Sequence, residues 1–204
     1  MNSATPTTFA EVAQQLHANG YRPFPGVQET KVPAMKGWPG LNRMPWDEAE
    51  LAATIADYQP EANYAACMAI QAELVAIDLD IVDHNAAVLA DELANKHLGR
   101  TPLVRIGQAP KQLRIYRQGG GGTSRKLHPV EIFSGTGQCV GFGQHQKTGH
   151  PYYWPDASPL ELVCNSPDIP KVTRAQLDRF TADLFKVVPR RLQVARSLPQ
   201  TGNL

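Results

Sequence analysis

The chain of 204 residues lacks the features of membrane, secreted and zinc-stabilised proteins. Its apolar runs fall well short of the roughly 20 residues that a transmembrane helix needs. Its first ten residues have neither the basic region nor the apolar run of a signal peptide. The three cysteines form an odd number without CxxC spacing, which argues against a disulfide framework or a structural zinc site. We therefore expect a soluble cytoplasmic protein whose cysteines are small core residues.

The sequence also lacks the periodic repeats of collagen, coiled coils and solenoids. Its 16 glycines and 17 prolines follow no period, which is typical of a fold with many loops. With 42% hydrophobic and 19% charged residues, the chain can bury one sizeable core that serves one domain or two small lobes. These features exclude a disordered chain and predict a mixed fold with many loops. The order of the helices and strands predicted below makes this an α+β fold.

The net charge of +1 conceals an asymmetry between the two halves of the chain. Residues 1–100 carry 6 Lys and Arg against 13 Asp and Glu, whereas residues 101–204 carry 14 against 6. Residues 105–126 contain no acid and six cations, which are Arg105, Lys111, Arg114, Arg117, Arg125 and Lys126. Such a stretch would attract a polyanion such as nucleic acid or a triphosphate. The alternative is a solvated basic face.

Apolar periodicity and capping residues predict the helices and strands. We expect helices at 8–19, about 47–56, 85–98 and 175–186, and strands at 74–81, 103–106, 112–117, 130–133 and 138–142. Residues 21–41 are rich in Pro and Gly and are predicted to form an ordered loop. Residues 119–123, Gly-Gly-Gly-Gly-Thr, lack the Lys-Ser/Thr ending of a P-loop and are predicted to form a hairpin tip.

Two carboxylates share one face of the predicted strand 74–81. Asp78 and Asp80 are alternate residues, so they lie about 6.6 Å apart on one side of the strand, opposite its apolar face. Their repulsion is on the order of 3 kcal/mol at that separation, and a divalent cation would remove it. Carboxylate oxygens are the ligands that Mg²⁺ and Mn²⁺ accept. The alternative is the solvent face of an edge strand.

A third acid, Glu131, interrupts the apolar strand 130–133 and is the only acid between Arg100 and Tyr153. Three carboxylates from two neighbouring strands can hold two metal ions at the separation of about 3.5–4 Å that in-line phosphoryl displacement uses. The alternative is a salt bridge from Glu131 to Arg105 or Arg114.

Several basic and aromatic residues could contact a nucleotide near these acids. Lys111 and Arg114 could grip phosphates, Arg as a bidentate donor and Lys as a mobile point charge. His145 lies in a glycine-bounded turn and could either hydrogen-bond a triphosphate or sugar, or cap its own loop. The aromatic run 152–154 could stack on a base or belong to the core.

Several short segments occur in a recognisable order along the chain. They are Lys31-Val-Pro, Gly37-Trp38, Val75-Ala-Ile-Asp78-Leu-Asp80, Val104-Arg105-Ile-Gly-Gln-Ala-Pro-Lys111, Val130-Glu131-Ile-Phe, Gly137-Gln138 and His145-Gln-Lys-Thr-Gly149-His-Pro-Tyr152-Tyr-Trp154. Over about residues 10–165 this set resembles the bifunctional DNA primase/polymerase (Prim-Pol) domain of the archaeo-eukaryotic primase superfamily. That domain typically forms the N-terminal part of phage and plasmid replication proteins.

The resemblance implies a catalytic core with an RRM-like mixed sheet flanked by helices, and a smaller α/β lobe. Residues 1–170 would form the catalytic domain, and residues 171–204 a helix and tail that lead to a following domain, often a helicase. By the same resemblance, Asp78, Asp80 and Glu131 would be the catalytic ligands of two Mg²⁺ or Mn²⁺ ions.

The family's middle motif usually provides a histidine on the strand after the two aspartates. Here the corresponding residues 109–116 contain none, so Lys111 or Arg114 would hold the triphosphate instead. Arg105 and His145 are the remaining candidate nucleotide contacts.

The activity that the resemblance implies is template-directed nucleotidyl transfer. The protein would synthesise and extend primers on single-stranded DNA from ribo- or deoxynucleoside triphosphates, in a cytoplasm that would be the host's if a phage encodes it. An alternative is a non-catalytic module that binds single-stranded DNA or an origin. A metal-dependent phosphodiesterase would use similar carboxylates but would shorten the strand.

Overall fold

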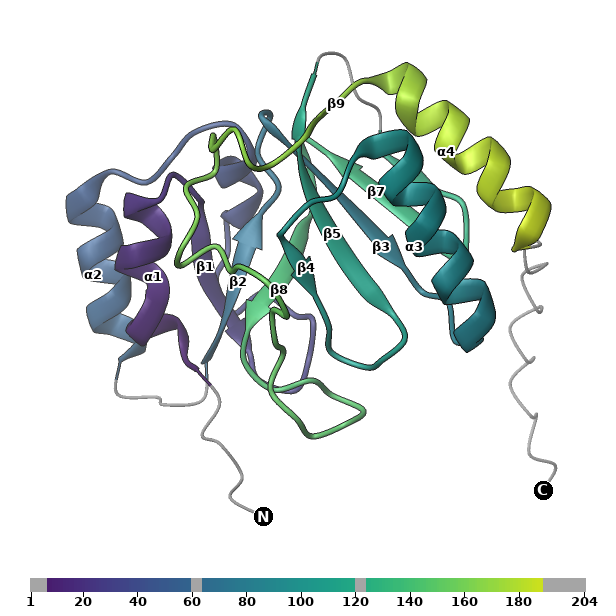
Figure 1. The fold of residues 1–204 in the computed structure, drawn as a ribbon. Coiled ribbons are helices and arrows are strands. Elements are labelled where there is room, and N and C mark those ends of the chain that lie inside the picture. The colour runs from purple at the N-terminus through teal and green to yellow at the C-terminus, as the bar shows by residue number, and fades with distance from the viewer. Residues whose placement is uncertain (1–6, 60–63, 120–123, 189–204) are drawn as a thin grey trace, which may run out of the picture.

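The protein is built on two β-sheets in a computed structural model, which describes residues 7–59, 64–119 and 124–188 (Figure 1). The large sheet has the strand order β4-β5-β3-β7-β6, and β9 pairs with β5 in parallel. Its strands are β3 (Leu74–Leu79), β4 (Val104–Arg105), β5 (Gln112–Gln118), β6 (Arg125–Lys126), β7 (Val130–Ser134) and β9 (Lys171–Val172). The small sheet has the order β1-β2-β8, formed by β1 (Pro23–Val27), β2 (Tyr64–Ala69) and β8 (Gln138–Phe142).

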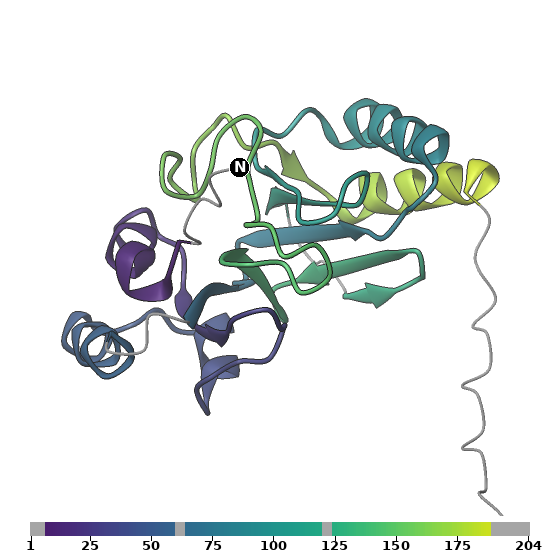
Figure 2. The same cartoon turned by 90° about the horizontal axis from the view of Figure 1, so that it is seen from below.

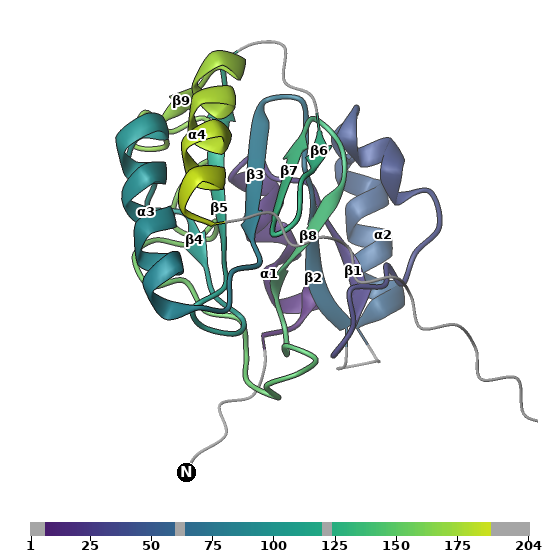
Figure 3. The same cartoon turned by 90° about the vertical axis from the view of Figure 1, so that its right-hand side faces the viewer.

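Two helices, α3 (His84–Leu98) and α4 (Arg174–Val187), cover one face of the large sheet (Figures 2 and 3). Asp83 caps the start of α3 by accepting a hydrogen bond from the Ala86 amide, and Gly99 with φ 87° ends the helix. The alanines that α3 turns toward the sheet, such as Ala90 and Ala94, are fully buried and allow a close approach. This layer therefore buries one face of the large sheet against α3 and α4.

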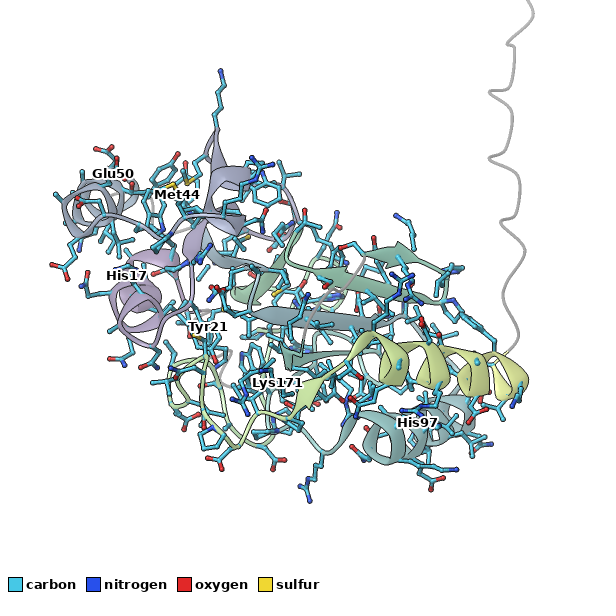
Figure 4. The ribbon with its side chains drawn as sticks, turned by 90° about the horizontal axis from the view of Figure 1, so that it is seen from above. His17, Tyr21, Met44, Glu50, His97 and Lys171 are labelled. Atoms are coloured by element: carbon cyan, nitrogen blue, oxygen red, sulfur yellow. The ribbon has the colours of Figure 1, made fainter. Side chains whose placement is uncertain are left out.

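The remaining helices lie with the small sheet at the other end of the molecule. They are α1 (Phe9–Ala18), α2 (Glu48–Tyr58) and a short 3₁₀ helix, η1 (Trp38–Asn42). Figure 4 shows this separation, with His17 of α1 and Glu50 of α2 far from His97 of α3. Side chains from α1, β2 and the second face of the large sheet form one continuous core, which joins the two sheets.

Strand β3 separates the apolar and polar parts of the molecule. Val75, Ile77 and Leu79 point to the layer of α3 and α4, and all are buried. On the opposite face the strand starts in the shared core, where Ala76 is fully buried, and continues with the half-buried Asp78. Alternate residues of a strand lie on one face, so along this second face β3 passes from the shared core into a polar region.

Most of the predicted elements are present, and the α+β class is confirmed. Helices α1, α2, α3 and α4 and strands β3, β4, β5, β7 and β8 each overlap their predicted ranges. Cys67 and Cys139 are buried core residues, as expected, whereas Cys164 is only partly buried and packs against the core. Residues 120–123 of the predicted hairpin tip lie outside the described residues.

The interpretation of residues 21–41 as a loop was wrong, because the segment contains β1. Pro23 and Pro25 argued against a strand in the sequence, because proline lacks the backbone N–H that a central strand needs. However, β1 lies at an edge of its sheet, where a missing N–H is tolerated. Strand β2 was also missed, because its sequence is rich in alanine, which has a low β propensity. Strands β6 and β9 span two residues each, too few for a periodic signal.

Residues 171–188 pack on the rest of the described protein. Strand β9 pairs with β5, and Phe180 and Leu184 of α4 are fully buried in the core that includes α3. The predicted domain boundary at residue 170 stays a prediction. Among the described helices, none has the length and apolar character that a bilayer crossing requires.

Candidate active site

A cleft of about 310 Å³ opens where β3 and β7 leave the shared core. It is lined by residues from the large sheet, from the 105–112 segment, from the turn after β8 and from the turn after β1. The charged and histidine residues in this lining are Asp78, Asp80, Glu131, Lys31, Arg105, Lys111, Lys126, Lys147, His128 and His145. The described lining thus has more cations than carboxylates, so an anion is attracted to the cleft even with all three acids ionised.

The three predicted acids all line this cleft. Asp78 and Glu131 are direct partners in the antiparallel pairing of β3 with β7, so their side chains project from the same face. Asp80 follows the end of β3, and its amide still donates to the carbonyl of Pro129 over 2.8 Å. The strand pairing is therefore consistent with the prediction that Asp78 and Asp80 share one side of the strand and that Glu131 lies beside them.

Two of the acids contact lysines. Lys111 Nζ lies 2.6 Å from Asp80 Oδ1, and Lys126 Nζ lies 3.8 Å from Glu131 Oε1. Partial burial tends to raise the pKa of Asp80, but the hydrogen bond and charge of Lys111, with Lys31 and His128, outweigh it and hold the pKa below its ordinary value. The Asp80 carboxylate is therefore ionised at neutral pH. The predicted salt bridge from Glu131 to an arginine is replaced by this contact with Lys126.

The chemistry of the donors fits a hard divalent cation. Like charges at directly opposed strand positions, as for Asp78 and Glu131, are destabilising unless a cation lies beside them. Within residues 7–59, 64–119 and 124–188, the side chains form no ready-made group of three His, Cys, Asp or Glu ligands. The lysine contacts of Asp80 and Glu131 are made by the same carboxylates that would hold a metal ion.

Arg105 forms one wall of the cleft and is held rigidly. Its side chain is only 7% exposed, its Nη1 donates to the carbonyl of Val140, and its guanidinium lies 4.4 Å from the centre of the Tyr152 ring. Its buried Nε has no hydrogen-bond partner among the described residues. A guanidinium fixed in the wall of a cleft is suited to attract an anionic oxygen.

His145 also packs on Tyr152. The two rings meet edge to face with centres 5.3 Å apart, and His145 Nδ1 lies 3.2 Å from Thr148 Oγ1. Burial, followed by the charges of Arg105 and nearby lysines, lowers the pKa of His145. The histidine therefore caps its own loop and also presents a neutral imidazole to the cleft, so both of its predicted roles are compatible with the structure.

Gly107 makes the close approach of these two rings possible. A Cβ at this position would lie 2.4 Å from Tyr152 Cε1 and 2.7 Å from His145 Cδ2. Any larger residue would have to displace one of the rings. Of the aromatic run 152–154, Tyr152 reaches the cleft, whereas Trp154 packs on the shared core and Tyr153 is half exposed.

The prediction that Arg114 grips phosphates is corrected by the structure. Its partner on β3 is Ile77, which faces α3 and α4, so Arg114 projects from the opposite face of the sheet to Asp78. There it pairs with Asp91, and its Nη2 and Nε donate to Asn95 Oδ1 and Tyr116 Oη over 2.6 and 3.0 Å. The cause is the alternation of side chains along β5. Leu113 and Ile115 project from the same face as Asp78, so Arg114 between them projects from the other face.

Sequence reasoning missed the cleft roles of Lys31, Lys126 and His128. Lys31 comes from the turn after β1, whose position is secured by a 3.0 Å hydrogen bond from Gln138 Nε2 to the Lys31 carbonyl. Lys126 is the cross-strand partner of Glu131. Lys126 belongs to the six-cation stretch 105–126, so a signal for it was present in the sequence. Only the pairing of β6 with β7 shows that Lys126 lies at the cleft. Its neighbour Arg125 points toward α4 instead and contacts Asp178.

Two comparisons with known proteins bear on the family of this chain. A search of curated proteins gave no significant match. A comparison with protein families matches residues 13–170 to the family described as bifunctional DNA primase/polymerase, N-terminal. The matched residues include strands β1 to β8, all three acids and the cationic wall of the cleft. The expected resemblance is confirmed, and the chain belongs to the bifunctional DNA primase/polymerase (Prim-Pol) family.

Proposed function

We propose that the cleft catalyses template-directed nucleotidyl transfer, by which the protein synthesises and extends primers on single-stranded DNA. The observation that carries this proposal is the placement of Asp78, Asp80 and Glu131 on one face of adjoining strands within a cationic cleft. Family membership implies DNA and nucleotide substrates, and the excess of lining cations suits both a triphosphate and a DNA backbone.

In this proposal the three carboxylates hold two Mg²⁺ or Mn²⁺ ions. When bound, such ions lower the pKa of the attacking 3′-hydroxyl and neutralise charge on the triphosphate. The protein's own contribution is to orient the carboxylates from a rigid sheet, so that they need little rearrangement during the reaction.

The basic residues of the cleft would bind and orient the incoming nucleotide. Lys111, Lys31 and Arg105 would contact phosphate oxygens, because each lines the cleft and carries a charge suited to that contact. His145 would donate or accept a neutral hydrogen bond at the phosphates or the sugar. Positioning of the α-phosphate for in-line attack would supply much of the rate enhancement.

The test is primer synthesis and extension on a single-stranded template with labelled nucleotides and Mn²⁺. We expect products longer than the primer, and we expect a chelator to abolish them. Binding of the template without any product, unaffected by chelator, would instead support a non-catalytic DNA-binding module. Shortened strands would indicate a phosphodiesterase. A longer chain that adds a helicase domain to this one is a further expectation of the proposal.

A further inference from the structure

The two lysines that contact the acids lie on the outer strands of the cleft. The strand order β5-β3-β7-β6 places the acids on the two inner strands, β3 and β7. Lys111 comes from the residue before β5, and Lys126 comes from β6, so the lysines flank the acids from both sides. Each lysine reaches inward to one carboxylate, Lys111 to Asp80 and Lys126 to Glu131.

An ammonium group and a divalent cation compete for the same carboxylate oxygens. Lys111 Nζ lies 2.6 Å from Asp80 Oδ1, and a divalent ion bound to the same carboxylate would repel the ammonium at that short range. We therefore expect the lysine to move away when a metal binds Asp80. Its long flexible side chain can do so, and a phosphate oxygen is a good new partner for a mobile ammonium.

We propose that Lys111, assisted by Lys126, exchanges its partner during substrate binding. Lys111 neutralises Asp80 before the divalent ions arrive, and it transfers to the triphosphate once the ions occupy the carboxylates. This inference rests on the proposed function of the cleft. Its consequence is that metal and nucleotide bind cooperatively, because the nucleotide provides a new partner for the ammonium that the metal displaces.

The neighbouring arginines show why lysines are needed for this exchange. Arg105 is fixed by Val140 and Tyr152, and Arg114 is fixed by Asp91, Asn95 and Tyr116. Neither can leave its site without losing several contacts. The side chains of Lys111 and Lys126 are 22% and 76% exposed and have one ion-pair partner each among the described residues.

The experiment is a titration of the purified chain with Mn²⁺ alone, with free Mn²⁺ measured by electron paramagnetic resonance. Lys111→Gln removes the competing ammonium, so we expect it to bind Mn²⁺ about fivefold more tightly than the wild type, as befits a partly exposed ion pair. Lys126→Gln should give a smaller increase, because its contact is longer and more exposed. Lys111→Arg keeps the charge and should bind Mn²⁺ nearly as the wild type does.

Lys147→Gln is the matched control, because Lys147 lines the same cleft and its loss changes the net charge equally. Its effect on Mn²⁺ affinity should be smaller than that of Lys111→Gln. A second titration uses a non-hydrolysable nucleoside triphosphate at saturating Mn²⁺. Here Lys111→Gln should bind the nucleotide about fivefold more weakly, so the one substitution strengthens metal binding and weakens nucleotide binding.

Mn²⁺ affinity that is unchanged or reduced in Lys111→Gln, with circular dichroism showing a folded protein, overturns the exchange. An increase equal to that of Lys147→Gln also overturns it, because net charge alone would then explain the effect. If the wild type extends primers while the exchange fails, the proposed function stands. If no variant binds Mn²⁺ and the wild type makes no product, both proposals fail.

Discussion

The two faces of the large sheet each carry a cation paired with an acid, and the pairs are built differently. On the face toward α3 and α4, Arg114 is 2% exposed and has Asp91, Asn95 and Tyr116 as partners. On the cleft face, Lys111 holds Asp80 by a single contact in a partly exposed setting. The pair of the buried Arg114 with Asp91 connects sheet to helix, whereas the cleft pair can be taken apart at little cost. Stability and chemistry are therefore placed on opposite sides of one sheet.

The largest expected effect comes from the cleft face. Asp78→Ala or Asp80→Ala should reduce primer extension by about a hundredfold or more, because either removes charge that the divalent ions require. The free energy of unfolding should not fall in Asp78→Ala, because the like charges of Asp78 and Glu131 are directly opposed. In Asp80→Ala it should fall by less than about 1 kcal/mol, because that variant loses the partly exposed pair with Lys111. Primer-extension assays and urea denaturation measure the two quantities. Full polymerising activity in either variant would remove the metal proposal.

The opposite face should show the reverse pattern. Asp91→Ala leaves the buried Arg114 guanidinium without its ion-pair partner and should lower the free energy of unfolding by about 3 kcal/mol. Primer extension by the folded fraction should be nearly unchanged. Asp156→Ala, which breaks the exposed pair with Arg100, is the control and should cost less than about 1 kcal/mol. Equal losses in the two variants would contradict the comparison of the two faces.

A smaller effect is expected where the cleft wall is tightly packed. Gly107→Ala would push Tyr152 or His145 aside and should raise the KM for nucleotide about tenfold, which corresponds to about 1.4 kcal/mol. Gly40→Ala is the matched control, since a Cβ there meets nothing within 4 Å. Steady-state kinetics at saturating template measure the change. A KM equal to that of Gly40→Ala would mean that the two rings do not contact the nucleotide.

The smallest expected effect is the pH dependence of the Lys111–Asp80 pair. The pKa of Asp80 is depressed in the folded state, so the pair contributes stability above the unfolded pKa of about 3.9 and loses it as pH falls through the folded value. The unfolding free-energy difference between wild type and Asp80→Asn should therefore shrink as pH falls from 6 to 3. Since Asp80 is half exposed, the change should stay below about 1 kcal/mol. A difference that grows toward low pH would contradict this pair.

Much of the fold could be predicted because its signals are local. The capping residues of α1 and α3 and the alternation along β3 depend only on neighbours in the chain. The prolines of β1 and the alanines of β2 give no such signal, because these strands are stabilised by their partners in the sheet. The same distinction between local and tertiary signals applies to the site. Its aspartates form a local pattern, whereas Lys31 approaches them only through the fold.

Sequence alone determined that Asp78 and Asp80 share a strand face, that an isolated acid follows in a basic segment, and that an ordered set of motifs resembles the Prim-Pol family. Only the tertiary structure decided which cations join them. It turned Arg114 to the opposite face and brought Lys31 and Lys126 into the cleft. The physical reason is that periodicity places residues on the faces of one strand, whereas the order and register of several strands decide which faces meet.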